Sequence, residues 1–293
     1  MKYYSNRKGI IIAGGNGKRL TPITRAISKQ IIPIYDKPMI YYPLTTLMLC
    51  GVKNILIITT PSSHDLFKKL LGNGKQWGLN FNYEVQKSPR GVADAILCGE
   101  DFIDNSPVVI VLGDNIFHGD QLVSLLHSAD QNYNNSTIFA YPVSNPEKYG
   151  VVQFDKHNCI LSIEEKPEHP KSQYVVPGLY FYDQSMIERI KELEVSSRNE
   201  LEITSLNQSY LNDQILNIEV MGRGMAWLDA GTFDSLHEGS AFIRSLEHRQ
   251  GLKVGCPEEV AWRQGWISNK QLHKLASSLV SSEYGKYLIR LLE

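Results

Sequence analysis

Short apolar runs alternate with amphipathic stretches through the first half of the chain. The runs are rich in β-branched and aromatic residues and are bounded by Gly, Pro or Asn, which is typical of strands. The predicted strands are residues 8–13, 54–60, 81–86 and 108–112, and the predicted helices between them are residues 41–50, 64–71, 92–101 and 121–132. Strands that alternate with helices indicate βαβ units and a mainly parallel sheet. Because ligands of such sheets bind beyond the carboxyl ends of the strands, the segments that follow each strand are the first candidates for a site.

The pattern changes after about residue 136. Predicted strands with short links, at residues 137–143, 150–154, 160–165 and 174–182, indicate an antiparallel or mixed region that extends the same sheet. Further along we expect helices at residues 185–193, 202–212 and 233–250, and a strand near residues 215–221. Residues 258–293 carry leucines at helical spacing. The sequence therefore predicts an α/β core over residues 1–250 and a helical C-terminal extension over residues 251–293 that packs on the core.

Composition and charge exclude several classes of protein. The chain has 293 residues, with 30 basic against 31 acidic side chains and a net charge of -1. This balance argues against a nucleic-acid binder that relies on a broad basic surface. Apolar runs stay far below the roughly 20 residues that cross a bilayer, and the apolar stretch at the N-terminus is too short for a signal peptide. Four scattered cysteines indicate reduced thiols, so we expect a cytoplasmic protein without a membrane anchor.

The first predicted strand runs into a glycine-rich loop, Ala13-Gly14-Gly15-Asn16-Gly17-Lys18-Arg19-Leu20. Glycines bring backbone N–H groups close to an anion, and the two cations add positive charge. A dinucleotide-binding loop would need Gly or Ala at Leu20, and a P-loop would need Ser or Thr at Arg19. The spacing thus excludes both motifs. It leaves either a different phosphate loop or a tight turn with solvated cations.

Other polar residues follow later strands. Asp114 lies behind a glycine after the strand at residues 108–112, and Asp229 repeats this arrangement far downstream. Carboxylates are the ligands that Mg²⁺ prefers. Gln86 follows another strand, and its amide suits the hydrogen-bonding edge of thymine or uracil, although the segment can equally be a plain strand–turn–helix corner. The lone Lys29 and the Glu-Glu-Lys run that ends at Lys166 are, taken singly, typical of solvated surface.

Taken together, these segments resemble a known family. GGNGKRLTPIT, then SKQIIPIYDKPMIYYPL, IEEKP, GLYFYD, ELEIT and WLDAGT are similar to the signature segments of the sugar-nucleotide pyrophosphorylases, and most of all to the thymidylyltransferase branch of that family. The resemblance extends over nearly the whole chain. It implies a Rossmann-like nucleotidyltransferase fold with a mainly parallel mixed central sheet flanked by helices. The nucleotide-binding part would span about residues 1–135 and the sugar-binding part about residues 136–235.

The resemblance also assigns roles to single residues. Those implied to bind the nucleotide are Gly14, Gly15, Gly17, Gln86 and Gly91, with Arg19, Lys29 and Lys166 as catalytic cations. Asp114 and Asp229 are implied to hold Mg²⁺. Those implied to bind the sugar phosphate are Gly150, Glu165, Lys166, Val176, Tyr180 and Arg198.

The chain departs from the family pattern at several positions. Lys18 stands where Thr is usual, Arg90 where an acidic residue is common, and Asp94 where Gln is common. Further departures are Pro177, Asn199 and Ala230. The changes at 90 and 94 lie beside the residues implied to read the base, and those at 177 and 199 lie beside the implied sugar site.

The implied reaction is thymidylyl transfer from dTTP to α-D-glucose 1-phosphate, giving dTDP-glucose and pyrophosphate for the synthesis of dTDP-deoxysugars such as dTDP-rhamnose. The nucleophile is already an anion, so orientation, charge neutralisation and a metal ion suffice. Two alternatives stay open. One is the same chemistry with UTP, and the other is a catalytically silent nucleotide-binding regulator of the same fold. A NAD-dependent dehydrogenase is excluded by the glycine spacing.

The resemblance further implies a homotetramer with a second nucleotide site near a subunit interface, through which an end product inhibits. The matching residues are His118, Gly119, Lys253 and Glu259. His118 stands where Tyr is usual, so the function of this site is an expectation that rests on position alone.

Overall fold

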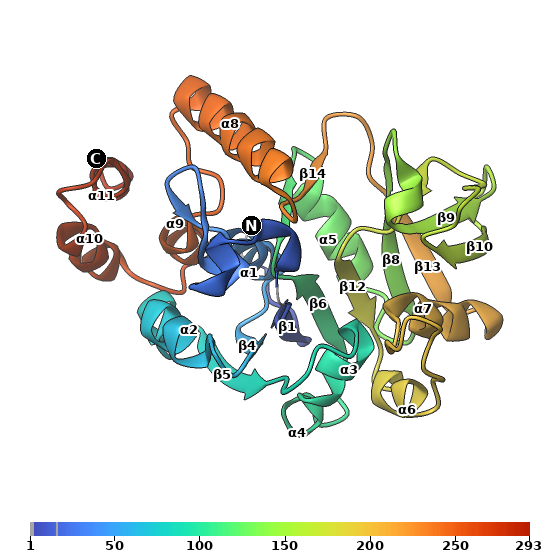
Figure 1. The fold of residues 1–293 in the computed structure, drawn as a ribbon. Coiled ribbons are helices and arrows are strands. Elements are labelled where there is room, and N and C mark those ends of the chain that lie inside the picture. Colours follow the sequence, from blue (N-terminus) through green and yellow to red (C-terminus); the bar gives the residue numbers. More distant parts are fainter. Residues whose placement is uncertain (1–2, 16) are drawn as a thin grey trace.

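The computed structural model describes residues 3–15 and 17–293, and its centre is a ten-stranded mixed sheet (Figure 1). Its strands are β1 (Lys8–Ala13), β4 (Asn54–Thr59), β5 (Asn80–Val85), β6 (Val108–Leu112), β8 (Ser136–Pro142), β9 (Gly150–Phe154), β10 (Ile160–Glu165), β11 (Tyr174–Val175), β12 (Leu179–Tyr182) and β13 (Leu216–Val220). The order across the sheet is β10-β9-β11-β8-β12-β6-β1-β4-β5, with β13 beside β8. The sheet confirms the predicted α/β class.

The half of the sheet built by the first part of the chain is parallel. β1 lies between β4 and β6, parallel to both, and β5 adds to β4 in the same direction. These strands are nearly continuous apolar runs because helices cover both faces of the sheet. β12 then joins β6 in antiparallel orientation, and β8, β9, β10 and β11 continue the antiparallel pattern. β13 runs parallel to β8, so the second half is mixed, as the short links predicted.

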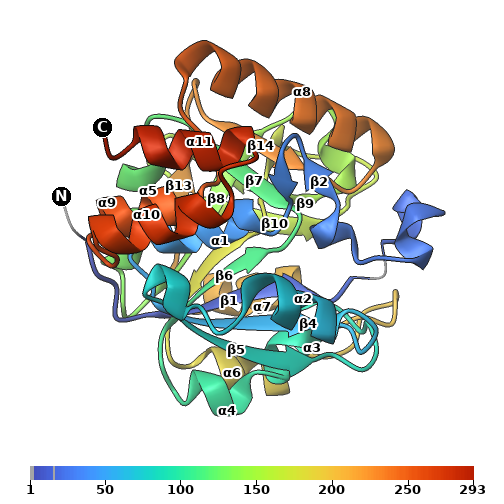
Figure 2. The ribbon, with the colours of Figure 1, turned by 90° about the vertical axis from the view of Figure 1, so that its left-hand side faces the viewer.

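Helices lie on both faces of the sheet (Figure 2). One face packs on α1 (Tyr41–Leu49), α2 (His64–Leu71) and α5 (Leu122–Asp130). The C-terminal helices α9 (Pro257–Arg263), α10 (Asn269–Ser278) and α11 (Glu283–Arg290) form an outer layer on this side, where α9 contacts α1 (Figure 1). The other face packs on α3 (Val92–Leu97), α4 (Glu100–Ile103), α6 (Met186–Lys191) and α7 (Ile203–Asn212). Apolar side chains of each helix set merge with those of one sheet face into a continuous core.

Two small sheets lie beside the main one, and neither was predicted. β2 (Pro33–Ile34) pairs with β3 (Lys37–Pro38), and β7 (Asn115–His118) pairs with β14 (Ala226–Asp229). The long helix α8 (Phe233–Gln250) follows β14 and starts with a capping box between Thr232 and Ser235. The β7–β14 pair brings together segments that are far apart in the chain.

Three predicted elements are interrupted in the structure. The helix expected over residues 92–101 breaks at Cys98 and Gly99, where an added Cβ on Gly99 would lie 2.4 Å from Leu56 Cδ2. The strand expected over residues 174–182 breaks at residues 176–178, which include Pro177. The helical tail consists of three short helices, because Gly265 adopts a left-handed conformation and Ser268 and Ser282 cap new helices.

Within residues 3–15 and 17–293, no helix has both the length and the apolar character needed to cross a membrane.

Candidate functional site

A cavity of about 430 Å³ lies beyond the carboxyl ends of the parallel strands. Its wall includes most of the residues that the sequence singled out: Gly14, Gly15, Arg19, Gln86, Gly91, Asp114, Gly150, Glu165, Lys166, Val176, Tyr180, Arg198 and Asp229. Gly17 and Lys29 are not in the wall, but Lys29 pairs with Asp114 and lies close to Gly15, and Gly17 lies close to Lys29. A cavity of this size suits a small ligand.

The glycine loop forms one side of the cavity. Gly17 has a left-handed conformation (φ 57°) and caps a short 3-10 helix, Lys18–Leu20, that carries Arg19. The Arg19 side chain reaches across to Gly231, where an added Cβ would lie 2.5 Å from Arg19 Nη2 and 3.0 Å from an oxygen of Asp229. The glycine turn therefore places the guanidinium next to a carboxylate from the far end of the chain. Asn16, part of the predicted loop, lies outside the described residues.

Asp114 is held by two neighbours at the end of β6. Lys29 Nζ forms an ion pair with Asp114 Oδ2, and Asn115 Nδ2 donates to Asp114 Oδ1 at 3.1 Å. Burial opposes ionisation of this carboxyl, but the charge and hydrogen bond of Lys29, together with Asn115, hold its pKa below the ordinary value. Lys29 thus points at the predicted metal ligand.

The second carboxylate comes from β14. The antiparallel pairing sets Asp229 opposite Asn115, and the N–H of Ala230 donates to the Asp114 carbonyl at 3.0 Å. Burial and the negative charge of Asp114 raise the pKa of Asp229 to about 6, against the opposing charges of Lys29, Arg19 and Lys166. The strand pairing and the hydrogen bond from Ala230 place the Asp229 and Asp114 segments side by side in the structure.

Asn115 is a buried polar residue that sequence reasoning missed. Its Oδ1 accepts from Trp227 Nε1 at 2.6 Å and from the N–H of Gly178 at 3.0 Å, while its Nδ2 binds Asp114. Asn115 therefore ties together β7, β14 and the start of β12. A single asparagine after an aspartate gives no signal of this in the sequence.

The opposite wall is built around Glu165 at the end of β10. Its carboxylate accepts from Thr204 Oγ1 and from Arg198 Nη2, which lies at 3.0 Å, and Lys166 Nζ lies 3.4 Å away. Burial opposes its ionisation, but the hydrogen bond from Thr204 and the charges of Lys166 and Arg198 lower its pKa. A Cβ on Gly150 would lie 3.2 Å from Thr204 Oγ1 and 3.3 Å from Glu165, so a glycine leaves room there. The wall thus offers two cations around one ionised carboxylate.

Metal-binding chemistry at this site depends on the carboxylate pair. Within residues 3–15 and 17–293, no cluster of three or more His, Cys, Asp or Glu side chains is arranged to hold a metal ion. Asp114 and Asp229 are a pair only, which fits Mg²⁺ because this ion keeps several of its positions for water and phosphate oxygens. Burial and the charge of Asp114 both raise the pKa of Asp229, so a bound cation would favour the ionised pair.

A second cavity, also of about 430 Å³, brings together the four residues of the expected regulatory site. His118 and Gly119 reach it from the end of β7, Lys253 from the loop after α8, and Glu259 from α9. Glu259 accepts from Arg263 Nε at 2.7 Å and also from Tyr287 Oη. Burial lowers the pKa of His118 and so favours its neutral form.

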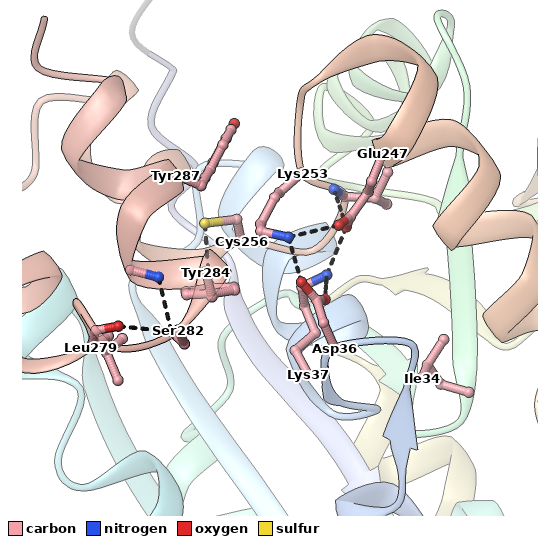
Figure 3. Close-up of polar contacts among 12 residues, drawn as sticks. Ile34, Asp36, Lys37, Glu247, Lys253, Cys256, Leu279, Ser282, Tyr284 and Tyr287 are labelled. Atoms are coloured by element: carbon pink, nitrogen blue, oxygen red, sulfur yellow. Dashed lines mark hydrogen bonds and ion pairs between the residues drawn. The ribbon is translucent and has the colours of Figure 1, made fainter.

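Lys253, which lines this second cavity, belongs to a partly buried ion network (Figure 3). Its ammonium binds Asp36 and Glu247, and Glu247 binds Lys37 Nζ at 2.7 Å and the N–H of Val254 at 3.0 Å. Lys37 and Asp36 belong to the β2–β3 hairpin, which follows the segment that carries Lys29. The network therefore joins the C-terminal part of the chain to the hairpin.

Among the described residues, no cysteine lines the catalytic cavity. All four are free thiols, and burial raises the pKa of Cys50 and of Cys256 well above the ordinary value. A buried thiol of raised pKa is a poor nucleophile.

The sequence of this chain is similar to a known protein family and to named proteins in other organisms. The model of the family described as nucleotidyl transferase matches residues 8–245. A glucose-1-phosphate thymidylyltransferase from Xanthomonas campestris pv. campestris (strain B100) is 54% identical over 287 residues, which is 98% of this chain and 97% of that protein. The protein of the same name from Mycobacterium tuberculosis (strain ATCC 25618 / H37Rv) is 54% identical over 286 residues, which is 98% of this chain and 99% of that protein.

Solved structures give the same result for the fold. A Bacillus anthracis protein described as a glucose-1-phosphate thymidylyltransferase, in complex with a sucrose, matches with a TM-score of 0.75 and 39% identity over 81% of this chain and 95% of that one. A UDP-glucose pyrophosphorylase complexed with UDP-glucose matches with a TM-score of 0.72 and 26% identity over 82% of this chain and 99% of that one.

Proposed function

The chain belongs to the nucleotidyl transferase family, and we propose that within this family it transfers a thymidylyl group from dTTP to α-D-glucose 1-phosphate, giving dTDP-glucose and pyrophosphate. The observation that carries the proposal is the shared wall of one cavity. The glycine loop with Arg19, the carboxylate pair and the cations around Glu165 all face the same space. Relatives of known name support the choice of substrates, and the product would supply the synthesis of dTDP-deoxysugars.

The reaction is a displacement at the α-phosphorus. An oxygen of glucose 1-phosphate attacks this phosphorus, the bond to the oxygen that bridges to the β-phosphate breaks, and pyrophosphate leaves with the electron pair. The attacking group is an anion, so no side chain has to remove a proton. What the protein must supply is alignment of the two phosphates and positive charge for the leaving group.

Each wall of the cavity supplies one of these needs. We assign Arg19 and Lys29 to the β- and γ-phosphates, and Lys166 and Arg198 to the sugar phosphate. Glu165 can accept hydrogen bonds from the sugar hydroxyls, beside Gly150, Val176 and Tyr180. On this proposal the nucleotide-binding part covers about residues 1–135 and the sugar-binding part about residues 136–235, with Asp229 returning to the nucleotide.

Proteins of this family generally use a divalent metal ion. We propose Mg²⁺ held by Asp114 and Asp229, because these two carboxylates lie close enough to repel each other and an ion would relieve the repulsion. When bound, the ion would polarise an oxygen of the α-phosphate and neutralise charge that develops there. Lys29 neutralises Asp114 in the structure and lies next to Gly15, so it can also reach the phosphate loop.

The experiment that tests the proposal compares nucleotides. Purified protein with Mg²⁺ and glucose 1-phosphate is assayed for pyrophosphate release with dTTP and with UTP in parallel. Faster turnover with dTTP supports the proposal. Preference for UTP would instead assign the activity of a uridylyltransferase, which the structural likeness to a UDP-glucose pyrophosphorylase keeps as the second candidate. Binding of dTTP without turnover of either nucleotide would favour a silent regulator, against which the retention of Arg19, Lys29 and Lys166 speaks.

We also propose a cytoplasmic homotetramer in which the second cavity binds a nucleotide-sugar end product. The gathering of His118, Gly119, Lys253 and Glu259 around one cavity supports the site, and the free thiols suit a reducing compartment. Light scattering measures the oligomeric state. Equilibrium binding of dTDP-rhamnose should give two sites per subunit, and a single site would contradict the regulatory cavity.

A further inference from the structure

The amide of Gln86 is held between two hydrogen-bond acceptors at the end of β5. Gln86 Nε2 donates to Asp94 Oδ2 at 2.8 Å and to the carbonyl oxygen of Gly91 at 3.2 Å. The other oxygen of Asp94 pairs with Arg90 Nη2 at 2.8 Å. Gln86 is 5% exposed and Asp94 is 6% exposed, whereas Arg90 lies in solvent.

These contacts leave only one orientation for the Gln86 amide. A carboxamide nitrogen has two hydrogens, and both acceptors here lack any. Turning the amide over would place Oε1 against a buried carboxylate and a carbonyl oxygen, and would leave all three buried acceptors without a donor, which is unfavourable. Both hydrogens are therefore used by Asp94 and Gly91.

The free end of the amide is consequently an acceptor, and it faces the phosphate loop. An added Cβ on Gly14 would lie 2.9 Å from Gln86 Oε1, so this oxygen sits against the first glycine of the loop. Gln86 and Gly14 both line the catalytic cavity, whereas Asp94 does not. Because Asp94 holds the amide nitrogen of Gln86, the amide oxygen is the atom left as a hydrogen-bond acceptor in the cavity wall.

We propose that Asp94 is a positioning residue that makes the site select bases with an N–H donor. By fixing Gln86 Oε1 toward the cavity, it favours the N3–H of thymine and uracil and opposes cytosine, whose N3 carries a lone pair. The inference rests on the proposed function, because it names how that site chooses its nucleotide. Asp94 is also one of the positions at which this chain departs from the family pattern.

The test replaces the carboxylate by a group of equal shape. In Asp94→Asn the side chain can offer either its oxygen or its N–H to Gln86, so only the Gly91 carbonyl still fixes the amide, and the turned orientation, which donates into the cavity, becomes accessible. We expect kcat/KM for dTTP to fall and kcat/KM for dCTP to rise, so that the ratio of the two falls about 10-fold or more. The KM for glucose 1-phosphate should not change. If the substitution only damaged the structure, kcat/KM would fall by the same factor for dTTP and for dCTP.

Arg90→Gln is the matched control, because it removes the other partner of Asp94 and keeps the carboxylate. An exposed ion pair contributes little, so the ratio should stay within about twofold of the wild-type value. Asp94→Ala is the second variant, in case Asp94→Asn does not fold as judged by its melting temperature. It removes the acceptor without adding a donor, so the ratio should fall by less than in Asp94→Asn. An unchanged ratio in the folded variants overturns the proposal.

The proposed function and this inference fail in different ways. If the wild-type protein turns over neither dTTP nor UTP, the proposed function fails, and calorimetric binding of dTTP and dCTP to the same variants then tests the inference. Preference of the wild-type protein for dTTP, with the dTTP/dCTP ratio unmoved by Asp94→Asn, would keep the function and refute the role of Asp94.

Discussion

Replacing Asp229 by Asn should make the metal-free protein more stable while it removes a proposed metal ligand. Asp229 faces the charge of Asp114 in a half-buried position, and both factors raise its pKa to about 6. In the unfolded chain the same carboxyl ionises freely near its ordinary value. Above pH 6 the folded protein therefore carries an anion that is more costly there than in the unfolded chain, and an amide of equal shape avoids this cost.

The magnitude follows from the pKa. A rise from 3.8 to about 6 corresponds to at most about 3 kcal/mol, because one pH unit is about 1.36 kcal/mol. Solvent at the half-buried carboxylate reduces this to about 1–2 kcal/mol. The folded state binds more protons than the unfolded state between these two pKa values, so stability of the wild-type protein falls as pH rises through this window. The gain of the variant should be complete above about pH 7 and absent below about pH 4.

Urea or thermal unfolding in EDTA measures the effect, with Asp130→Asn as the matched control. At pH 7.5, Asp229→Asn should melt about 2–6 °C above the wild-type protein. Asp130 is fully buried and pairs with Arg7 Nε at 3.2 Å, so its variant should lose about 3–5 kcal/mol. Excess Mg²⁺ should stabilise the wild-type protein but not Asp229→Asn. A melting temperature of Asp229→Asn below that of the wild type at pH 7.5 would refute the reasoning.

Three further predictions concern the sugar wall, the metal site and the ion network. Arg198→Leu removes a cation from the cavity wall that we assign to the sugar phosphate. Initial rates should show a KM for glucose 1-phosphate raised about 10-fold or more and a smaller rise in the KM for dTTP. Equal rises in the two KM values would contradict the assignment. Because protons compete with the metal for a carboxyl whose pKa is about 6, the concentration of Mg²⁺ needed for half-maximal pyrophosphate release should rise as pH falls below 6, and excess Mg²⁺ should restore the rate. Glu247→Ala removes one carboxylate from the buried Lys37 and from its neighbour Lys253. The free energy of unfolding in urea should therefore fall by about 3 kcal/mol. Glu283 belongs to an exposed ion pair, so Glu283→Ala should lower the free energy of unfolding by less than about 1 kcal/mol.

The core of the fold was predictable because burial on both faces leaves a strong pattern. β1 and β6 have the predicted bounds, since each is an apolar run that ends in a polar or glycine-containing turn. The breaks at Gly99 and Pro177 were not predicted, because they depend on tertiary contact and on a short kink inside otherwise regular patterns. Periodicity gives the existence of an element more reliably than its interruptions.

Parts of the candidate site that lie in sequence motifs could be predicted from the sequence. Contacts between residues from distant segments could not. The glycine loop was found from its own segment, but Glu165 and the pairing of Asp114 with Asp229 needed the resemblance, since a Glu-Glu-Lys run alone is typical of solvated surface and β7 and β14 are only four residues long. Asn115 and the hydrogen bond from Gln86 to Asp94 were missed altogether. Both depend on which way a buried amide faces, and that is set by neighbours brought close only in the folded chain.

In the proposed reaction, glucose 1-phosphate itself attacks the α-phosphorus of a thymidine nucleotide in this cavity. Glucose 1-phosphate carrying ¹⁸O at all phosphate oxygens, incubated with dTTP, Mg²⁺ and the wild-type protein, tests this attack by mass spectrometry of both products. We expect dTDP-glucose that retains all four labelled oxygens and pyrophosphate that contains none. Label in the pyrophosphate, or release of pyrophosphate together with dTMP and unreacted glucose 1-phosphate, would contradict it.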